Sequence, residues 1–314
     1  MTNGYVLTAG EVCGLLLAEP GTPLRRAQRL RRGVAGAESN VAVALARLGH
    51  NVVFCGRVGD DAAGDWIRDT LRGEGVDVSH LRTDPERPTG LIVRDCVAGR
   101  PLTVNYHRRG SAGSALSAED LDDDVVRHAS AVFVSGITAA LTPQTAAFTD
   151  RLLNLAGGAA VPVLYDPNVR LRLAPAARWS DDLRRLRDRI DTILVGDSEL
   201  AQLGIAEPGQ LLSDRTHTVV VKRGARGATA ITKGGITIDV PARAVPTIDP
   251  VGAGDAFDAG FMSAQLHGQP LRDALKAGAA VASLVVSTAT DLDGLPTARE
   301  TEMILHSAGG DVDR

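Results

Sequence analysis

"DPVGAGDAFDAGF" (residues 249–261) places two glycines and an aspartate at the start of a helical pattern. Glycines leave backbone amides uncovered, and the unpaired amides at a helix N-terminus attract anions such as phosphate. Asp255 would repel such an anion unless it acts on the hydroxyl that attacks a transferring phosphoryl group. The stretch therefore predicts a phosphoryl-transfer site, with Asp255 as base and the amides of Gly252, Ala253 and Gly254 as anion hole. The alternative is a helix cap, a common use of Asp in a first turn.

Short apolar runs alternate with helical patterns along the chain before this stretch. The segment 38–49 is typical of the helices, because Val41, Leu45 and Leu48 recur at helical spacing and a glycine follows. Runs that are apolar on both faces, with helices between them, indicate a parallel sheet that is covered on both sides. We therefore predict an α/β fold, whose strands are expected within 51–58, 129–136, 161–166, 191–196 and 216–222.

Two segments depart from this alternation, residues 12–36 and residues 88–108. The second has the pattern of a hairpin that turns near Ala98–Arg100. We predict one domain over residues 1–306, which carries these two segments as a small β appendage. We expect the stretch 307–314 to form a frayed tail, because its residues are mostly small or polar and continue no helical or strand pattern.

The composition is that of a soluble globular protein. Of the 314 residues 44% are hydrophobic and 23% are charged, and a net charge of −4 argues against binding to nucleic acid or acidic membranes. The arginine-rich stretch 25–32 is expected to be a solvated surface element. The three cysteines form no C-x-x-C pair, which argues against a disulfide framework or zinc site and fits the reducing cytoplasm. No stretch approaches the ~18 apolar residues of a membrane span, and we expect no signal peptide.

The 249–261 stretch resembles the C-terminal signature of the ribokinase-like (PfkB) carbohydrate kinases, a D-T-x-G-A-G-D-x-F pattern. "VAGAESNVAVALARLG" (34–49) and "GRVGDDAAG" (56–64) are similar to that family's N-terminal signature. The two motifs stand in the family's order, so the resemblance covers essentially the whole chain. It implies a three-layer α/β/α Rossmann-like (ribokinase-like) domain with a small β-sheet lid, here 12–36 and 88–108. It also implies phosphorylation of a sugar hydroxyl by ATP with Mg²⁺. Whether a monovalent cation such as K⁺ is also needed stays open.

The resemblance also assigns roles around the nucleotide. Asp255 carries over as the catalytic base, and the amides of Gly252–Gly254 carry over as the anion hole for developing charge on the γ-phosphate. "VVVKRGARGA" (219–228) is similar to a family segment whose loop lies on the nucleotide, and its residues to carry over are Lys222, Gly224 and Gly227. The alternative for Lys222 is an exposed lysine at a strand end.

The metal motif of the family is only partly kept. "GDSEL" (196–200) has the glutamate of the family's N-x-x-E pattern, so Glu199 is expected to orient Mg²⁺ through water. The alternative for Glu199 is an acid of a helix first turn. The chain departs from the family's pattern where Gly196 replaces an asparagine, Pro250 a threonine and Ala35 the first glycine of a pair.

Two stretches resemble the 2-keto-3-deoxygluconate kinase branch of the family. In "NYHRRGSA" (105–112) and "DPNVRLRL" (166–173), Tyr106, Arg108 and Arg170 stand where that branch holds the sugar-acid carboxylate. Arginine suits a carboxylate, because its planar fork donates two parallel hydrogen bonds. Surface charge is the alternative for Arg108.

Two residues near the N-terminal motif complete the expected sugar site. Asn40, at the opening of a helix over 40–48, is expected by resemblance to bind a sugar hydroxyl, and an N-cap is its alternative. Gly36 would let the sugar lie close to the backbone.

Other functions stay open from the sequence. His107 stands where the branch shows a second aromatic residue, so a neutral-sugar kinase of the fructose or ribose type is an alternative. Another is a catalytically weakened sugar-binding regulatory protein on the same fold, in view of Pro250 and Gly196. A dinucleotide-binding oxidoreductase is disfavoured, because no G-x-G-x-x-G follows the first strand. The expected partners are a small-molecule sugar or sugar acid and a second copy of the chain, paired through the lid.

Overall fold

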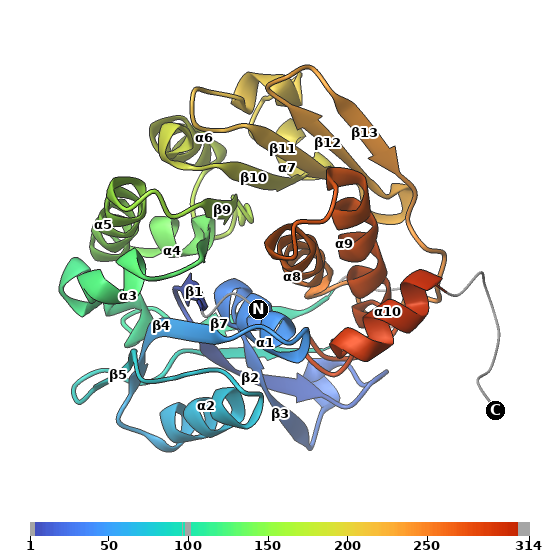
Figure 1. Ribbon diagram of the computed structural model, residues 1–314. Coiled ribbons are helices and arrows are strands. Elements are labelled where there is room, and N and C mark those ends of the chain that lie inside the picture. Colours follow the sequence, from blue (N-terminus) through green and yellow to red (C-terminus); the bar gives the residue numbers. More distant parts are fainter. Residues whose placement is uncertain (1–3, 96, 98–101, 307–314) are drawn as a thin grey trace.

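A large mixed sheet forms the centre of the molecule (Figure 1). The computed structural model describes residues 4–95, 97 and 102–306. The sheet has nine strands in the order β13-β12-β11-β10-β9-β8-β1-β4-β5, and all pairings from β11 to β5 are parallel. Its strands are β1 (Val6–Ala9), β4 (Val52–Gly59), β5 (Leu81–Asp84), β8 (Ala131–Ser135), β9 (Val163–Asp166), β10 (Thr192–Gly196), β11 (Thr218–Lys222), β12 (Ala228–Thr232) and β13 (Thr237–Val240).

The five apolar runs identified in the sequence correspond to the strands β4, β8, β9, β10 and β11, as predicted, although β4 ends one residue beyond its run, at Gly59. The sheet is not parallel throughout, however, because β12 and β13 add an antiparallel edge. These two strands alternate buried and more exposed residues, which is the pattern of strands with one solvated face.

Side chains of the central strands alternate between two hydrophobic cores. In β8, Val132 and Val134 belong to one core and Phe133 to the other, and all three are fully buried. Helices therefore cover both faces, and the predicted three-layer α/β/α fold is confirmed. The helices of the Phe133 side are α1 (Ala37–Arg47), α2 (Ala62–Gly73), α8 (Ala253–Leu266) and α9 (Leu271–Val285), with α10 (Ala298–His306) packed on α9; those of the other side are α3 (Asp123–Arg127), α4 (Gly136–Leu141), α5 (Pro143–Gly158), α6 (Ala176–Leu186) and α7 (Asp197–Gln202).

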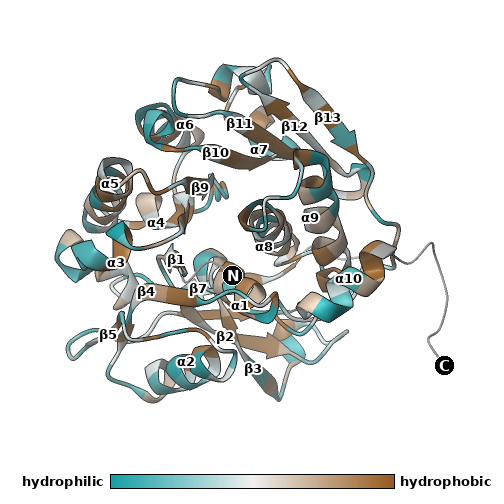
Figure 2. Cartoon of the chain, in the orientation of Figure 1, coloured by the Kyte–Doolittle hydropathy of each residue, from teal (hydrophilic) through white to brown (hydrophobic). Residues whose placement is uncertain are grey.

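Hydropathy follows this layering. Figure 2 shows strands of the large sheet such as β4 and β10 as hydrophobic, whereas the outer helices α2, α3 and α6 carry much hydrophilic surface. Over the part of the chain that the structure describes, no helix has the length and apolar character needed to cross a membrane.

A second sheet of four strands lies beside the large one, in the order β3-β2-β6-β7. Its strands are β2 (Cys13–Ala18), β3 (Leu30–Ala35), β6 (Leu91–Arg94) and β7 (Val104–His107). They fall within the segments 12–36 and 88–108, and the role of this sheet as a lid stays a prediction. The hairpin turn expected near 98–100 and the tail 307–314 lie outside the described residues.

A tight turn joins β11 to β12 through the short 3₁₀ helix Gly224–Arg226. Gly227, which follows it, has φ +88°, and a Cβ atom there would lie 2.0 Å from the Val240 carbonyl oxygen. Gly224 has φ +55°, but a Cβ atom there would meet nothing within 4 Å. Gly227 is therefore required by packing as well as by its backbone conformation, whereas Gly224 is required by conformation alone.

We expect Gly227→Ala to lower the free energy of unfolding by about 2 kcal/mol or more, because the methyl group displaces the edge strand β13. The matched control Gly224→Ala should cost only about 1 kcal/mol, the ordinary strain of a left-handed alanine. Urea denaturation of the two variants measures both values. Equal losses would show that the clash at Gly227 relaxes freely.

Candidate active site

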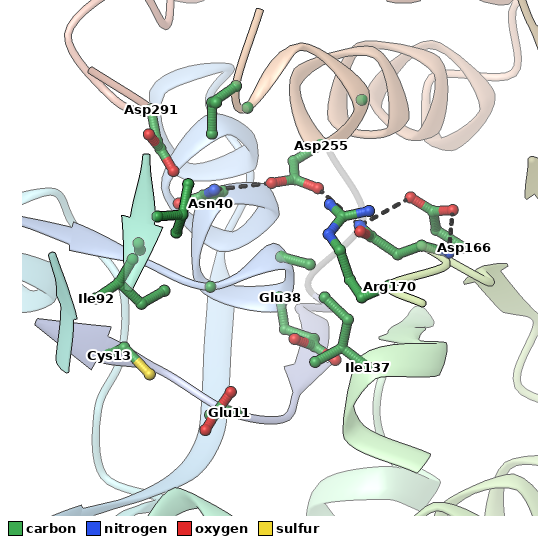
Figure 3. Close-up of a pocket in the computed structure, with 18 of the residues that line it drawn as sticks. Glu11, Cys13, Glu38, Asn40, Ile92, Ile137, Asp166, Arg170, Asp255 and Asp291 are labelled. Atoms are coloured by element: carbon green, nitrogen blue, oxygen red, sulfur yellow. Dashed lines mark hydrogen bonds between the residues drawn. The ribbon is translucent and has the colours of Figure 1, made fainter. Parts of the chain in front are cut away.

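A cavity of about 480 Å³ lies where the small sheet faces the carboxyl ends of the central strands. Asp166, Gly196 and Lys222 line it from the ends of β9, β10 and β11, the edge at which parallel sheets bind ligands. The start of α8 closes one side, and residues of β2, β6 and β7 close another. Figure 3 shows Asn40, Asp255, Asp166 and Arg170 grouped in this space.

The carboxylate of Asp255 sits in the first turn of α8 and is 8% exposed. It accepts hydrogen bonds from the side-chain amides of Asn40 (2.7 Å) and Asn168 (3.2 Å). Burial raises the pKa of Asp255 to about 7, although the Asn40 hydrogen bond opposes the shift. The helix-cap alternative does not describe this residue, because its donors within the described chain are side chains from other elements.

The first turn of α8 opens with glycine in a left-handed conformation. Gly252 is the N-cap, with φ +83°, and the amides that follow have no carbonyl one turn earlier within the helix. Gly252 and Gly254 both line the cavity, and a Cβ atom on Gly254 would lie 3.6 Å from the Lys222 Nζ. The turn thus presents uncovered backbone close to a cation, which suits an anionic group.

Lys222 is not the exposed strand-end lysine that the sequence left open. Its side chain is only 13% exposed, and Nζ donates to Asp166 (2.9 Å) and to both oxygens of Asp258 (2.9 and 3.0 Å). Burial alone would lower the pKa of Lys222, but the neighbouring carboxylates raise it above its ordinary value. Lys222 therefore stays cationic beside the turn.

The five residues expected to bind the sugar, Gly36, Asn40, Tyr106, Arg108 and Arg170, all line this one cavity. Surface charge does not describe Arg108, because its side chain is 12% exposed and donates to Glu11 at 2.7 Å. Its guanidinium also lies 4.6 Å from the centre of the Tyr106 ring. Arg170 is 46% exposed; it donates to the Val169 carbonyl and lies 4.0 Å from Glu199. Figure 3 shows it directed toward Asp255.

Asn40 is not an N-cap, because α1 begins at Ala37 with Gly36 as its N-cap. Gly36 has φ +147°, and a Cβ atom there would lie 2.6 Å from the Glu11 carbonyl oxygen, so the backbone needs glycine at this approach. Three buried oxygens around the cavity have no hydrogen-bond partner within the described chain: Asn40 Oδ1, Asn168 Oδ1 and Glu11 Oε1. Buried acceptors are normally paired, so these oxygens suit the hydroxyls of a ligand.

Glu199 binds backbone amides, as expected for an acid in the first turn of a helix, which was the alternative to a metal-binding role. Its two oxygens accept from the backbone amides of Gly196 and Val169, each at 2.7 Å. Among the described residues, no group of three or more His, Cys, Asp or Glu side chains is arranged to hold a metal ion. A role for Glu199 toward Mg²⁺ stays a prediction. Gly224 and Gly227 do not line this cavity, so their contact with a nucleotide also stays a prediction.

Two buried residues of the site were not predicted from the sequence. Asn168, with φ +47°, donates from Nδ2 to Asp166 and to Asp255 and so links β9 to α8. Glu38 accepts three hydrogen bonds at Oε1, from the Ser135 amide and from the hydroxyls of Ser135 and Thr138. An Asn just after a buried strand and an acid at the start of an apolar helix were the available signals.

A buried ion cluster was also missed. Arg94, the last residue of β6, donates to Asp249 (2.5 Å) and Asp291 (2.6 Å) and is 2% exposed. An arginine within the apolar run "LIVRDC" was the signal, because a strand that buries such a residue must also bury its partner.

Sequence comparison relates almost the whole chain to known carbohydrate kinases. The model of the pfkB family of carbohydrate kinases matches residues 6–298. The 2-dehydro-3-deoxygluconokinase of Thermoproteus tenax is 37% identical, over 91% of this chain and 89% of that protein. The 2-dehydro-3-deoxygluconokinase of Bacillus subtilis (strain 168) is 34% identical, over 93% of this chain and 92% of that protein.

A solved structure shows the same likeness in three dimensions. The PfkB protein from Polaromonas sp. JS666 superposes with a TM-score of 0.84 at 33% identity, covering 95% of this chain and 99% of that one. The ribokinase-like fold expected from the resemblance is therefore confirmed. The chain belongs to the pfkB family of carbohydrate kinases and is a phosphotransferase that acts on a sugar.

Proposed function

We propose that this kinase transfers the γ-phosphate of ATP to a hydroxyl of 2-keto-3-deoxygluconate (2-dehydro-3-deoxygluconate). The observation that carries the proposal is the convergence on one cavity of the Asp255 carboxylate, the α8 first-turn amides and the arginine pair Arg108 and Arg170. The two relatives that bear the name of this activity support the choice of sugar acid.

Asp255 acts as the general base. Its pKa of about 7 is set by burial and lies close to neutral pH, where a base is both deprotonated and strong enough to take a hydroxyl proton. Asn40 and Asn168 hold the carboxylate from two sides without adding positive charge. The attacking oxygen therefore loses its proton to Asp255 as its bond to phosphorus forms.

The turn 252–254 stabilises the charge of the transferring group. The Ala253 amide donates to the Pro250 carbonyl at 3.4 Å, a long hydrogen bond that an anion would replace. The Lys222 ammonium adds positive charge next to Gly254. Mg²⁺ bound with the nucleotide would neutralise phosphate charge. Both oxygens of Glu199 are taken by amides, so this residue fits the ion through bridging water rather than as a direct ligand.

The sugar would fill the remaining part of the cavity. The unpaired oxygens of Asn40, Asn168 and Glu11 accept hydrogen bonds from its hydroxyls, and Arg170 supplies the cation for its carboxylate. A dimer through the small sheet, a cytoplasmic location and the use of K⁺ stay predictions.

A neutral sugar is the second candidate, favoured by one observation. Glu11 lies 2.7 Å from Arg108 and already compensates its charge. A sugar acid must therefore rely mainly on Arg170, whereas a neutral sugar such as fructose needs no cation.

Asp255→Asn should lower kcat by about 10²–10⁴-fold, because the amide keeps the shape of the side chain but accepts no proton. ADP release with ATP and Mg²⁺ over 2-keto-3-deoxygluconate, fructose, ribose and adenosine measures this loss and identifies the substrate. The control is Asp65→Asn, an exposed first-turn acid of α2. Retention of a tenth or more of wild-type kcat by Asp255→Asn would remove Asp255 from the mechanism.

The pH profile should report the same carboxylate. Since the reaction needs ionised Asp255, kcat/KM should rise as the pH passes through its pKa of about 7 and level off above. The residual activity of Asp255→Asn should lack this limb. A wild-type profile that is flat between pH 5.5 and 8 would contradict the assignment.

Arg170→Ala should reduce kcat/KM for the sugar acid by about 10–150-fold, the loss expected when one charge-assisted hydrogen bond to the substrate is removed. Turnover of a neutral sugar should change much less, and Arg170→Lys should rescue the acid only partly, because an ammonium lacks the fork. The control is Arg184→Ala, an exposed arginine of α6 that does not line the cavity. Equal losses on acidic and neutral sugars would favour the neutral-sugar candidate.

A further inference from the structure

A buried ion cluster joins the small sheet to the segments on either side of the anion-binding turn. Arg94 ends β6 of the small sheet, and its Nη1 and Nη2 donate to different carboxylates, Asp249 Oδ2 at 2.5 Å and Asp291 Oδ1 at 2.6 Å. The three side chains are no more than 5% exposed. A guanidinium that is shared in this way fixes the distance between its two partners.

Both partners of Arg94 support the turn itself. The second oxygen of Asp249 accepts from the Val251 amide at 3.0 Å and so shapes the approach to Gly252. The Cα atom of Asp291 lies 3.2 Å from the point that a Cβ atom on Gly252 would occupy, so this backbone lies against the turn. Arg94 therefore acts on the turn from two sides: through Asp249, which precedes the turn in the chain, and through Asp291, whose backbone lies against Gly252.

The same strand is also tied to the sugar-facing residues. β6 pairs with β7 in a register that sets Arg94 opposite Val104 and Ile92 opposite Tyr106. Arg94, Ile92 and Tyr106 all line the cavity. A sugar that is held by Tyr106 and Arg108 would thus steady the strand from which Arg94 extends.

We propose that Arg94 is a positioning residue that links the shape of the 252–254 turn to the placement of the small sheet. The rate of phosphoryl transfer then depends on where the small sheet lies relative to the turn. The consequence for the rate rests on the proposed function of the turn as an anion hole. The mechanical link between the sheet and the turn does not.

The chain offers a matched control for this link. Arg31 of β3 pairs with Asp293 at 3.1 Å and so spans the same two parts of the molecule, but these side chains are 51% and 54% exposed. Neither residue lines the cavity. An exposed pair of this kind contributes little to stability, so the same substitution at Arg31 tests for an unspecific effect of replacing arginine by lysine in one contact.

The first experiment compares steady-state kinetics of Arg94→Lys and Arg31→Lys. Lysine keeps the charge but cannot hold both carboxylates in a fork. Arg94→Lys should lower kcat for sugar phosphorylation by about 10–100-fold, less than the ~10²–10³-fold for removal of an oxyanion donor, because the amides stay in place but are less well oriented. The KM for ATP should change much less. Arg31→Lys should match the wild type. An Arg94→Lys variant with wild-type kcat and only a lower melting temperature would reduce Arg94 to a structural role.

Chemical rescue separates charge from packing. In Arg94→Ala, guanidinium chloride at millimolar concentration should restore part of kcat, whereas KCl at equal ionic strength should restore less. No rescue by guanidinium in a folded variant would overturn the positioning role. If Arg94→Ala does not fold, the triple variant Arg94→Met, Asp249→Asn, Asp291→Asn removes the three charges together and should fold with low kcat; wild-type kcat in that variant would overturn the proposal.

Hydrogen exchange tests the link without any substrate. The amides of residues 251–256 should exchange faster in Arg94→Lys than in the wild type, while Arg31→Lys should leave them unchanged. Unchanged exchange in Arg94→Lys would overturn the link. If exchange rises as expected but the wild type phosphorylates no sugar of the panel, the proposed function fails and the link stands.

Discussion

The ammonium of Lys222 compensates a concentration of buried negative charge. Asp166 and Asp258 accept from it directly, and Asp258 lies one helical turn after Asp255 on α8. A carboxylate that is buried this deeply is strongly disfavoured unless it is paired or protonated. Because the lysine comes from β11 and Asp258 from α8, the same contact also fixes where α8 sits on the sheet. The positions of Asp255 and of the turn 252–254 follow from it.

Asp255 differs from Asp166 and Asp258 in its hydrogen-bond partners. It has no direct ion pair within the described residues, and its donors are the neutral amides of Asn40 and Asn168. An arginine or lysine in direct contact would lower the pKa of the carboxylate and weaken it as a base. The two asparagines therefore orient the carboxylate while burial keeps it basic. Their own oxygens remain free for a ligand.

Local sequence was enough to predict the layers and to single out the α8 turn as a candidate site. The strands were visible because strands that are buried on both faces are continuously apolar, and the α8 turn was visible because its glycines and Asp255 are neighbours in the chain. The antiparallel edge β12–β13 was not predicted, since short strands with one solvated face give a weak pattern.

Charge partners could not be predicted in the same way. Arg108 and Glu11 are 97 residues apart, and Asn168 and Asp255 are 87 apart, so only the fold brings them together. The burial of Lys222 has the same origin: a lysine at a strand end is usually solvated, and the fold brings Asp166 of β9 and Asp258 of α8 against it.

The parallel pairing of β2 with β6 makes the small sheet a composite of two distant stretches of the chain. Exchange of one stretch alone would disturb the small core between them, in which Leu15 and Leu17 of β2 pack with Ile92 of β6. We therefore expect the two stretches to change together in evolution, and a chimaera should exchange both of them as one module. Since Arg94 must still meet Asp249 and Asp291, that module is compatible only with recipients that carry both acids. Diversification of substrate preference in such a scaffold is expected to proceed by side-chain replacement within the module rather than by its transfer.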